Sequence, residues 1–276
     1  MIELPEVVTI AAQMQRELKG RKIAAANGGN SPHKWFFCKP GAGEIAEKLI
    51  GRRIERVEGV GAWIHTHLRP RGVLTIGALG GRILLHGDAG DLPKKHQVFV
   101  GFDDGRSLTV AVQGWGFARL GPKPQAACDE EANRGLPPND ARFTYDYFKQ
   151  LVADALAAGK RLSVKQLLVS KPGLGGLGNG CLQDILFAAR IHPKRQVAEI
   201  SPREQQALFR AIRKTTAEMI RLGGRDEERD LYNHPGGYRP VMDKRTRGTP
   251  CPTCGTPIEK IAYLGGSCYL CPKCQT

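Results

Sequence analysis

Residues 251–274 read CPTCGTPIEKIAYLGGSCYLCPKC, in which two Cys-x-x-Cys pairs are separated by a spacer of 16 residues. Each pair can bind a metal ion from a tight turn, and two such pairs supply the four thiolates of a closed tetrahedral zinc site. The spacing therefore predicts one structural Zn²⁺ per chain, bound by Cys251, Cys254, Cys271 and Cys274. A site closed by four thiolates does no chemistry itself, but it makes a short segment rigid enough to present other residues.

The residues between the two pairs are typical of a β-hairpin that turns at Gly265 and Gly266. A fifth thiol, Cys268, falls outside the spacing, and we expect it to be a half-buried small residue rather than a ligand. Five of the eight cysteines lie in the last 26 residues, and no export signal is evident. Because disulfides are rare outside oxidising compartments, this clustering favours metal binding.

The composition bounds the number of domains and the kind of partner. A chain of 276 residues is long enough for about two domains, at roughly 150 residues each. The formal net charge is +14, and residues 160–276 carry 20 lysines and arginines against 10 acidic residues. This excess suits a phosphate-rich partner such as nucleic acid, although a solvated basic surface explains the charge equally well.

The sequence contains no signal for membrane insertion or export. No apolar run approaches the roughly 18 residues of a membrane span, and no cleavable signal pattern precedes Glu3. We therefore expect a cytoplasmic bacterial protein, associated with the nucleoid, that acts as a monomer and has no membrane partner.

The first ten residues, MIELPEVVTI, predict the start of a helix. Pro5 suits the first helical position, where its missing N–H would be unpaired in any case. Glu3 and Glu6 then lie beside the positive end of the helix dipole, close to the α-amine of Met1. Acidic residues are common in a first helical turn, so these positions alone do not establish a catalytic role. The helix is expected to end at Gly20, after an amphipathic pattern formed by Val7, Ile10, Ala11, Met14 and Leu18.

Apolar runs and breaker residues divide the chain into four regions. Residues 1–122 contain β-like runs punctuated by glycine, including an Asp-Asp-Gly turn between two apolar stretches that is typical of a hairpin. Residues 123–141 are polar and proline-rich, as in a linker. Residues 142–245 form a mainly helical domain, and residues 246–276 form the four-cysteine segment.

The helical region contains a glycine-rich loop, KPGLGGLGNG (171–180), between helices that begin with capping boxes at Ser163 and Ser201. The loop matches Gly-x-Gly-x-x-Gly, but no strand precedes it, so the context of a dinucleotide site is absent. Its glycine N–H groups, its Asn179 amide and the following helix N-terminus favour an anion, which on a basic domain is a nucleic-acid phosphate. We expect phosphate contacts from Lys171, Gly178, Asn179, Arg245 and Arg247.

Several motifs together resemble the formamidopyrimidine-DNA glycosylase and endonuclease VIII family. They are the four-cysteine segment, ELPE (3–6), PGLGGLGNG (172–180), DILFAARIHP (184–193) and PGGY (235–238), and they span nearly the whole chain. The resemblance implies an α+β multidomain fold: an N-terminal β-sandwich with a flanking helix, a helix-two-turn-helix domain and a C-terminal β-hairpin zinc finger. It also implies that the protein binds damaged double-stranded DNA, flips out a base, cuts the glycosidic bond and nicks the abasic strand.

The residue after the initiator methionine departs from this family. A typical member has proline there, and its secondary amine attacks the sugar C1′ to form a Schiff base. Here the second residue is Ile2, whose bulky side chain normally prevents removal of the initiator methionine. The expected N-terminus is therefore Met1, which lies one residue before the position of the family's proline. The nucleophile of the family is missing.

Other family residues are changed as well, whereas the scaffold is kept. The catalytic-domain lysine corresponds to Ala62, the arginine-rich segment that fills the gap left by the flipped base resembles VQGWGF, and the phosphate-gripping arginine of the finger falls at Gly266. Glu3, Glu6, Asn179, the four cysteines and His86, in a stretch that resembles the family's strand-end histidine, remain. Trp63 and Trp115 could stack on a base, but tryptophan in a sheet-rich domain is more often part of the core.

Two functions remain open on these residues. The favoured one is a DNA glycosylase in which Glu3 activates water at C1′, with lyase activity weak or absent and with Glu6 and Met1 as further catalytic candidates. A variant of this mechanism has the Met1 amine itself attack C1′. The alternative is a protein of the same fold that binds damaged DNA without cutting it. The identity of the lesion is not encoded in any motif of the sequence.

Overall fold

The computed structural model describes residues 1–87, 91–124, 135–159, 161–170 and 173–276. Two compact units divide the chain. The first is formed by Met1–Ala132 together with Leu222–Gly237, and the second by Asn133–Arg221 together with Tyr238–Thr276. The segment Leu222–Gly237 therefore belongs to the unit that holds the N-terminus, although it follows the helical region in sequence. No described helix is long and apolar enough to cross a membrane.

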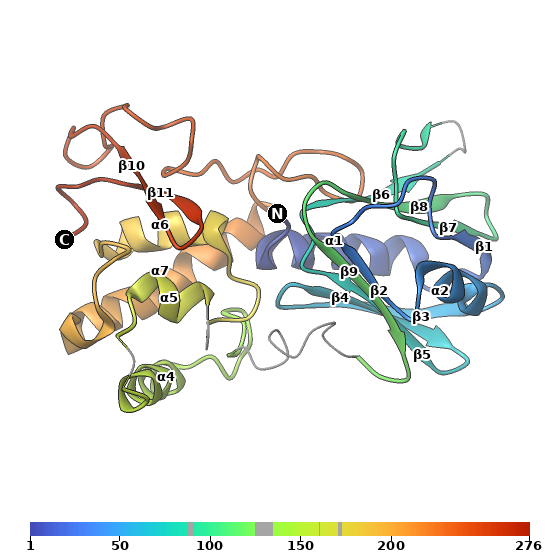
Figure 1. Cartoon of the computed structure of the whole chain (residues 1–276), viewed down its shortest axis with the longest axis horizontal. Coiled ribbons are helices and arrows are strands. Elements are labelled where there is room, and N and C mark those ends of the chain that lie inside the picture. The colour runs from blue at the N-terminus through green and yellow to red at the C-terminus, as the bar shows by residue number, and fades with distance from the viewer. Residues whose placement is uncertain (88–90, 125–134, 160, 171–172) are drawn as a thin grey trace. The chain divides into compact units, whose positions relative to one another are not determined.

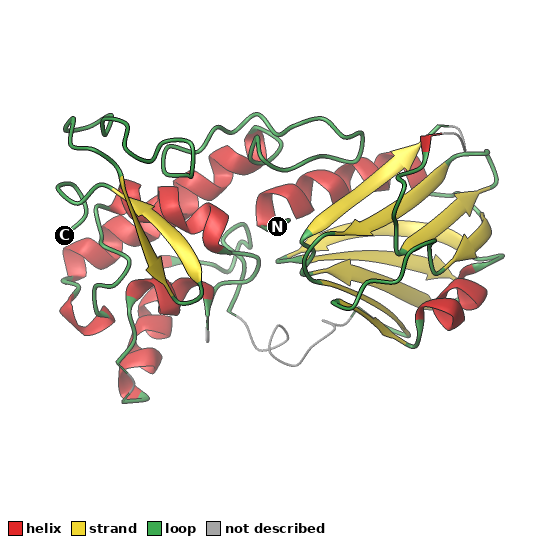
Figure 2. Cartoon of the chain, turned by 45° about the horizontal axis from the view of Figure 1, so that its top comes forward, coloured by secondary structure: helices red, strands yellow, loops and turns green. Residues whose placement is uncertain are grey.

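The first unit is the β-sandwich expected from the resemblance (Figures 1 and 2). One sheet has the strand order β1 (Ile23–Asn27), β7 (Val98–Phe102), β8 (Ser107–Val112) and β6 (Gly81–His86). The other has the order β2 (Phe36–Lys39), β9 (Gly116–Gly121), β5 (Gly72–Gly77), β4 (Trp63–Arg69) and β3 (Arg53–Val60). All pairs are antiparallel except β2 with β9. The predicted Asp-Asp-Gly hairpin is confirmed as the turn between β7 and β8.

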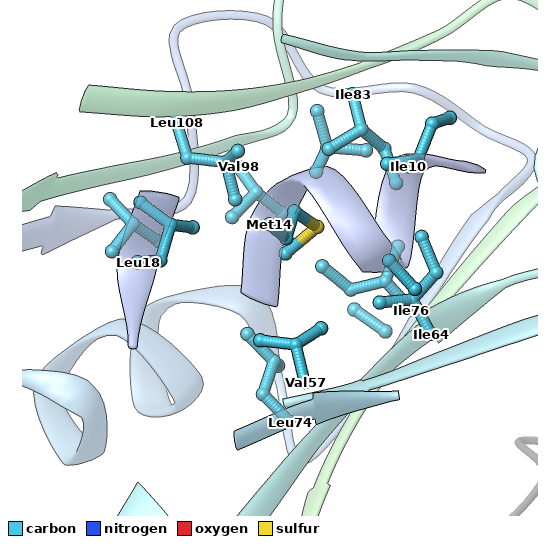
Figure 3. Packing of buried hydrophobic residues seen from close by; sticks show 14 of the residues in the cluster. Ile10, Met14, Leu18, Val57, Ile64, Leu74, Ile76, Ile83, Val98 and Leu108 are labelled. Atoms are coloured by element: carbon cyan, nitrogen blue, oxygen red, sulfur yellow. The ribbon is translucent and has the colours of Figure 1, made fainter. Parts of the chain in front are cut away.

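Helix α1 (Leu4–Leu18) packs its apolar face into the core of this unit, and the shorter helix α2 (Ala42–Leu49) follows β2. Figure 3 shows Ile10, Met14 and Leu18 of α1 among apolar side chains of both sheets. Burying each such side chain contributes about 1.5–3 kcal/mol to folding. The helix begins one residue earlier than predicted, because Glu3 is the N-cap and Pro5 is the second helical residue. It ends before Gly20, whose φ of +83° stops the helix as expected.

The second unit is helical and carries the C-terminal hairpin (Figure 2). Its helices are α4 (Tyr145–Ala157), α5 (Val164–Val169), α6 (Asn179–Ala189), the 3₁₀ turn η2 (Val197–Glu199) and α7 (Pro202–Arg221). Its two strands are β10 (Glu259–Tyr263) and β11 (Gly266–Leu270), joined by a turn at Leu264 and Gly265. The predicted capping boxes are confirmed, since Ser163 bonds with Gln166 and Ser201 bonds with Glu204.

A buried carboxylate fixes the segment that leads to the hairpin. Asp184 of α6 is 3% exposed and accepts hydrogen bonds from the hydroxyl of Tyr238 and from the backbone N–H groups of Val241 and Met242, at 2.8–2.9 Å. Burial raises the pKa of Asp184, while these three donors lower it. Asp184, the first residue of the DILFAARIHP motif, therefore holds the end of the PGGY segment and the residues that follow it.

Two expectations about single side chains are wrong. Trp115, expected in the core, is 51% exposed, whereas Trp63 is buried as expected. Trp115 directly precedes β9, and its ring lies against those of Trp35 and Phe37 instead of in the core. Cys268, expected to be half-buried, is only 1% exposed, because its strand β11 packs against α6.

Candidate functional site

Two glutamates at the start of α1 share a buried arginine. Glu3, Glu6 and Arg225 are 4%, 2% and 4% exposed, and all three belong to the first unit. The backbone N–H of Glu3 donates to Glu6 Oε2 at 2.9 Å, which completes a capping box at the helix start. The positive end of the helix dipole therefore faces both carboxylates.

Arg225 pairs with Glu6 through two parallel bonds. Its Nε donates to Glu6 Oε1 at 3.1 Å and its Nη2 donates to Glu6 Oε2 at 2.8 Å, while its backbone N–H also donates to Oε1 at 2.9 Å. Its Nη1 lies 3.5 Å from Glu3 Oε1. The preceding Gly224 has φ +100°, and a Cβ there would approach Glu6 Oε1 to 3.1 Å, so glycine allows this close approach.

The first two residues are held by the same segment. The α-ammonium of Met1 lies 2.5 Å from Glu228 Oε1, and the carbonyl of Met1 accepts from Arg225 Nη2 at 2.8 Å. Ile2 is 4% exposed in the core of the sandwich, and its N–H donates to the carbonyl of Leu79 at 2.8 Å. The amine is already engaged by Glu228, so this arrangement favours a carboxylate over the amine as the reactive group.

The two carboxylates have different environments. Glu6 is held by three bonds from Arg225, which suits a positioning role. Glu3 has the longer ion pair, with 3.5 Å between its Oε1 and Arg225 Nη1. An ionised carboxylate next to a bound water can act as a general base. No local motif marks Arg225 and Glu228, because only folding brings the charged run GGRDEERD (223–230) to the N-terminus.

His86 is the last residue of β6, as the resemblance implied. It is 7% exposed, and its Nε2 lies 2.8 Å from the hydroxyl oxygen of Thr109. Burial lowers its pKa, which favours the neutral ring. Ala62 lies in the turn between β3 and β4, beside Gly61 with φ +58°, where its methyl group offers no proton-transfer chemistry.

The four predicted metal ligands meet in the second unit. The Sγ atoms of Cys251, Cys254, Cys271 and Cys274 all lie within 4.8 Å of one another. The Cys251–Cys274 and Cys254–Cys271 sulfur pairs are 3.9 Å and 3.4 Å apart. A tetrahedral ion with Zn–S bonds of about 2.3 Å requires sulfur pairs about 3.8 Å apart, so the cluster can hold such an ion with small adjustments.

The glycine-rich loop meets the hairpin at the start of α6. Gly178 is the N-cap of α6, and Asn179 is its first residue. Asn179 Nδ2 donates to the carbonyl of Ser267 at 2.8 Å, which uses one of the two amide hydrogens. Its Oδ1 accepts from Lys165 Nζ at 2.9 Å. Both polar atoms of the Asn179 side chain therefore have protein partners, and they connect the start of α6 to β11 and to Lys165.

Lys165 was not singled out from the sequence. It is 2% exposed, and its Nζ also donates to the carbonyl of Tyr263 at 2.9 Å and to Cys268 Sγ at 3.2 Å. These bonds fasten both strands of the hairpin to α5, and they give Cys268 a role other than ligation. Lys165 follows a capping serine, and nothing in that local pattern indicates a buried cation.

The remaining basic candidates have different surroundings. Arg245 donates from Nε to Asp243 Oδ2 at 2.6 Å, and Arg247 is exposed. Lys171 lies outside the described residues. The structure therefore groups Glu3, Glu6 and Met1 in the first unit. In the second unit it groups Gly178 and Asn179 with the hairpin, next to the strand that leads to Cys271.

Two domain families match the chain. Residues 1–113 match the formamidopyrimidine-DNA glycosylase N-terminal domain, and residues 135–229 match the formamidopyrimidine-DNA glycosylase H2TH domain. A formamidopyrimidine-DNA glycosylase of Symbiobacterium thermophilum is 31% identical over 100% of this chain and 89% of its own length. That of Chloroflexus aurantiacus is 31% identical over 100% and 98%. The chain therefore belongs to the formamidopyrimidine-DNA glycosylase family.

Solved structures have the same fold. MutM (Fpg) from Thermus thermophilus gives a TM-score of 0.83 at 23% identity, covering 99% of this chain and 98% of that one. Lactococcus lactis Fpg, in complex with DNA containing N7-benzyl-Fapy-dG, gives 0.84 at 22% identity with 99% of both chains covered. These similarities confirm the predicted fold class: a β-sandwich, a helical domain and a four-cysteine hairpin.

The buried Arg225 provides a first prediction. The Arg225→Gln variant leaves two carboxylates without their cation in the protein interior, and we expect its free energy of unfolding to fall by about 3–5 kcal/mol. The control is Arg69→Gln, which removes an exposed ion pair with Glu55 and is expected to cost far less, because solvent screens that pair. Urea unfolding measures both. Equal stability losses in the two variants would show that Arg225 does not hold the N-terminal carboxylates.

Proposed function

We propose that this protein is a DNA glycosylase that binds damaged double-stranded DNA, flips out a base and hydrolyses its N-glycosidic bond, with little or no lyase activity. The observation that carries the proposal is that the buried carboxylates of Glu3 and Glu6 share Arg225, while the Met1 amine next to them is paired with Glu228. DNA as the partner is supported by the family and by the damaged or abasic DNA named with its structural relatives. Such a substrate would place the protein at the nucleoid.

The proposed reaction uses water as the nucleophile. Glu3 accepts a proton from a water molecule while the water oxygen forms a bond to C1′ of the sugar. The bond between C1′ and the base nitrogen breaks, and the departing base leaves with the electron pair and takes up a proton from solvent. Glu3 then releases the proton that it accepted to solvent. Arg225 orients Glu3 before the reaction, through the 3.5 Å contact between Nη1 and Oε1. A positioned general base of this kind contributes about 10²–10⁴-fold to a rate.

The amine route is disfavoured by geometry and by pairing. The buried Ile2 occupies the place that the reactive proline has in typical family members, so the amine is one residue further along the chain. The amine lies 2.5 Å from Glu228 Oε1, which engages it away from a substrate. A Schiff base requires a free amine within bonding distance of C1′. We therefore assign Met1 a binding role, in which its carbonyl helps to orient Arg225.

DNA contacts are proposed from both units. In the helix-two-turn-helix domain, proposed here as 142–245, the N-terminus of α6 at Gly178 and Asn179 would bind a backbone phosphate. The further DNA contacts are proposed for Lys171, Arg245, Arg247 and His86. The remaining boundaries are a glycosylase-like domain at 1–122, a linker at 123–141 and a finger at 246–276.

The metal proposed for the four-cysteine cluster is Zn²⁺. Sulfur separations of 3.4 and 3.9 Å are close to those of a tetrahedral thiolate site, and the spacing of the two pairs is that of structural zinc ligands. The ion would tie the turn at Cys251 and Cys254 to the end of β11, which strengthens the hairpin that Lys165 and Asn179 hold.

Metal analysis tests this assignment. The purified protein is expected to contain about one zinc per chain, and Cys271→Ala is expected to lose it and to weaken DNA binding, because an incomplete ligand set no longer folds the finger. Cys38→Ala is the matched control, since Cys38 lies in β2 of the other unit. Zinc-free protein, or full DNA affinity after Cys271→Ala, would contradict the assignment.

Incubation with a panel of damaged duplexes tests the activity, with base release measured separately from strand scission. We expect wild-type protein to release a base and to leave an intact abasic strand that breaks only on alkali treatment. Glu3→Gln is expected to lower base release by about 10²–10⁴-fold, because the amide cannot accept the proton. Glu44→Gln, which changes an exposed glutamate, is the control and should leave the rate unchanged.

Two results would contradict the proposal in different ways. Efficient strand scission without alkali would show that lyase activity is retained. Tight binding of damaged duplexes without base release from any of them would instead favour the second candidate function, a damaged-DNA-binding protein that does not cut.

A further inference from the structure

Four aromatic side chains form a partly exposed cluster at one edge of the sandwich, which we call the aromatic shelf. Trp35 and Phe37 come from β2 and the residue before it, and Trp115 and Phe117 come from β9 and the residue before it. Trp35, Phe37 and Trp115 are 40%, 42% and 51% exposed. They make up three of the eight large hydrophobic side chains that are exposed in the described chain. Neither the core nor the carboxylate site uses them.

The rings of the shelf lie against one another. The centroids of Trp35 and Trp115 are 4.5 Å apart, and those of Phe37 and Phe117 are 5.1 Å apart with planes 25° from parallel. Phe37 is also stacked on Trp115 at 6.0 Å. Phe36 and Cys38 pack against the core, so Phe37 between them faces away from it. The shelf is therefore on the outer face of the sheet, at its β2 edge (Figure 1).

Backbone hydrogen bonds hold the shelf in place. The N–H of Gly116 donates to the carbonyl of Trp35 at 3.0 Å, and the N–H of Gly80 donates to the carbonyl of Trp115 at 2.7 Å. A Cβ on Gly116 would come within 2.9 Å of Leu79 Cδ1 and 3.1 Å of Phe36 Cδ2, so the missing side chain of glycine allows this close packing. Because the rings are already ordered, the protein would lose little conformational entropy when a ligand stacks on them.

The surroundings of the shelf are positively charged. Lys34 Nζ lies 4.8 Å from the centroid of the Trp35 ring. Lys39 and Arg119 are paired in the parallel register of β2 with β9, two residues beyond Phe37 and Phe117, and so share their face. Residues 28–41 and 111–121, which carry the shelf, contain no aspartate or glutamate. Stacking surfaces bordered by cations match the alternation of bases and phosphates in a nucleic-acid strand.

We propose that the aromatic shelf binds single-stranded DNA, with unpaired bases stacked on Trp35, Trp115 and Phe37 and phosphates paired with Lys34, Lys39 and Arg119. Bases that are paired in a duplex are stacked on their neighbours and cannot present a face to these rings. The shelf would therefore recognise strands that are already open, in any sequence. The proposal shares its DNA partner with the proposed function but requires neither Glu3 nor hydrolysis.

Tryptophan fluorescence measures this binding directly. Short oligothymidylate added to wild-type protein is expected to quench the emission, because bases stack on Trp35 and Trp115. The Phe37→Ala and Trp35→Ala variants are each expected to weaken binding of the oligonucleotide by about fivefold to 150-fold, the loss of one stacked base. Trp35→Phe keeps a ring and should retain most of the affinity. Ile50→Ala, which truncates an exposed apolar residue of the same unit, should bind as wild type does.

Separate readouts distinguish this proposal from the catalytic one. Base release from a damaged duplex should be unchanged by Phe37→Ala, whereas Glu3→Gln should lower it by about 10²–10⁴-fold and leave oligothymidylate binding intact. Circular dichroism at about 25 °C checks that each variant is folded. Absence of quenching, or equal affinities of wild type, Phe37→Ala and Trp35→Ala, would overturn the proposal. The proposal would also be overturned if wild-type protein sediments as a dimer and Trp35→Ala sediments as a monomer, because the shelf would then bind a second copy of the chain.

Discussion

The pairing of Arg225 with Glu6 and Glu3 is the interaction on which the candidate catalytic site depends. A guanidinium that is 4% exposed requires anionic partners, because the cost of removing an unpaired charge from water is several kcal/mol. Glu6 supplies a bidentate partner, and the Met1 carbonyl accepts a further bond. This pairing draws residues 222–237 back to the sandwich, where the N–H of Leu231 donates to Gln13 at 2.9 Å. The start of α1 is thereby fixed against a distant part of the chain.

The same cluster is the basis of the proposed change of nucleophile on the family scaffold. The α-amine is bound by Glu228 and displaced by Ile2, whereas Glu3 stays at the helix start with a cation beside it. By the resemblance, Ala62 and Gly266 stand where typical members carry side chains that serve the lyase steps or grip phosphate. At the hairpin, Lys165 supplies a buried cation 3.6 Å from the position that a Cβ on Gly266 would take. The proposed hydrolysis of the N-glycosidic bond by water requires neither the family's proline amine nor the side chains replaced at Ala62 and Gly266.

Features set by near neighbours in the sequence were predictable. The Ser163 and Ser201 capping boxes, the Asp-Asp-Gly hairpin and the spacing of the four cysteines each depend on a few consecutive residues, and the structure has all of them. Arg225, Glu228 and Lys165 were not found, because their partners lie 98 or more residues away or, for Asn179, across a loop. The exposure of Trp115 was not predictable, because composition does not show which face of a sheet a tryptophan side chain lies on. Burial and long-range pairing arise only when the units fold.

Borohydride trapping on damaged and abasic duplex DNA distinguishes water from the amine most directly. Borohydride reduces a Schiff base to a stable covalent complex, so a family member that begins with Met-Pro serves as the positive control. This protein, with Met1 confirmed by intact mass, is predicted to release base from the damaged duplex without forming a trapped complex. A covalent complex formed as efficiently as in the control would show that the Met1 amine attacks C1′, and it would contradict hydrolysis by a Glu3-activated water.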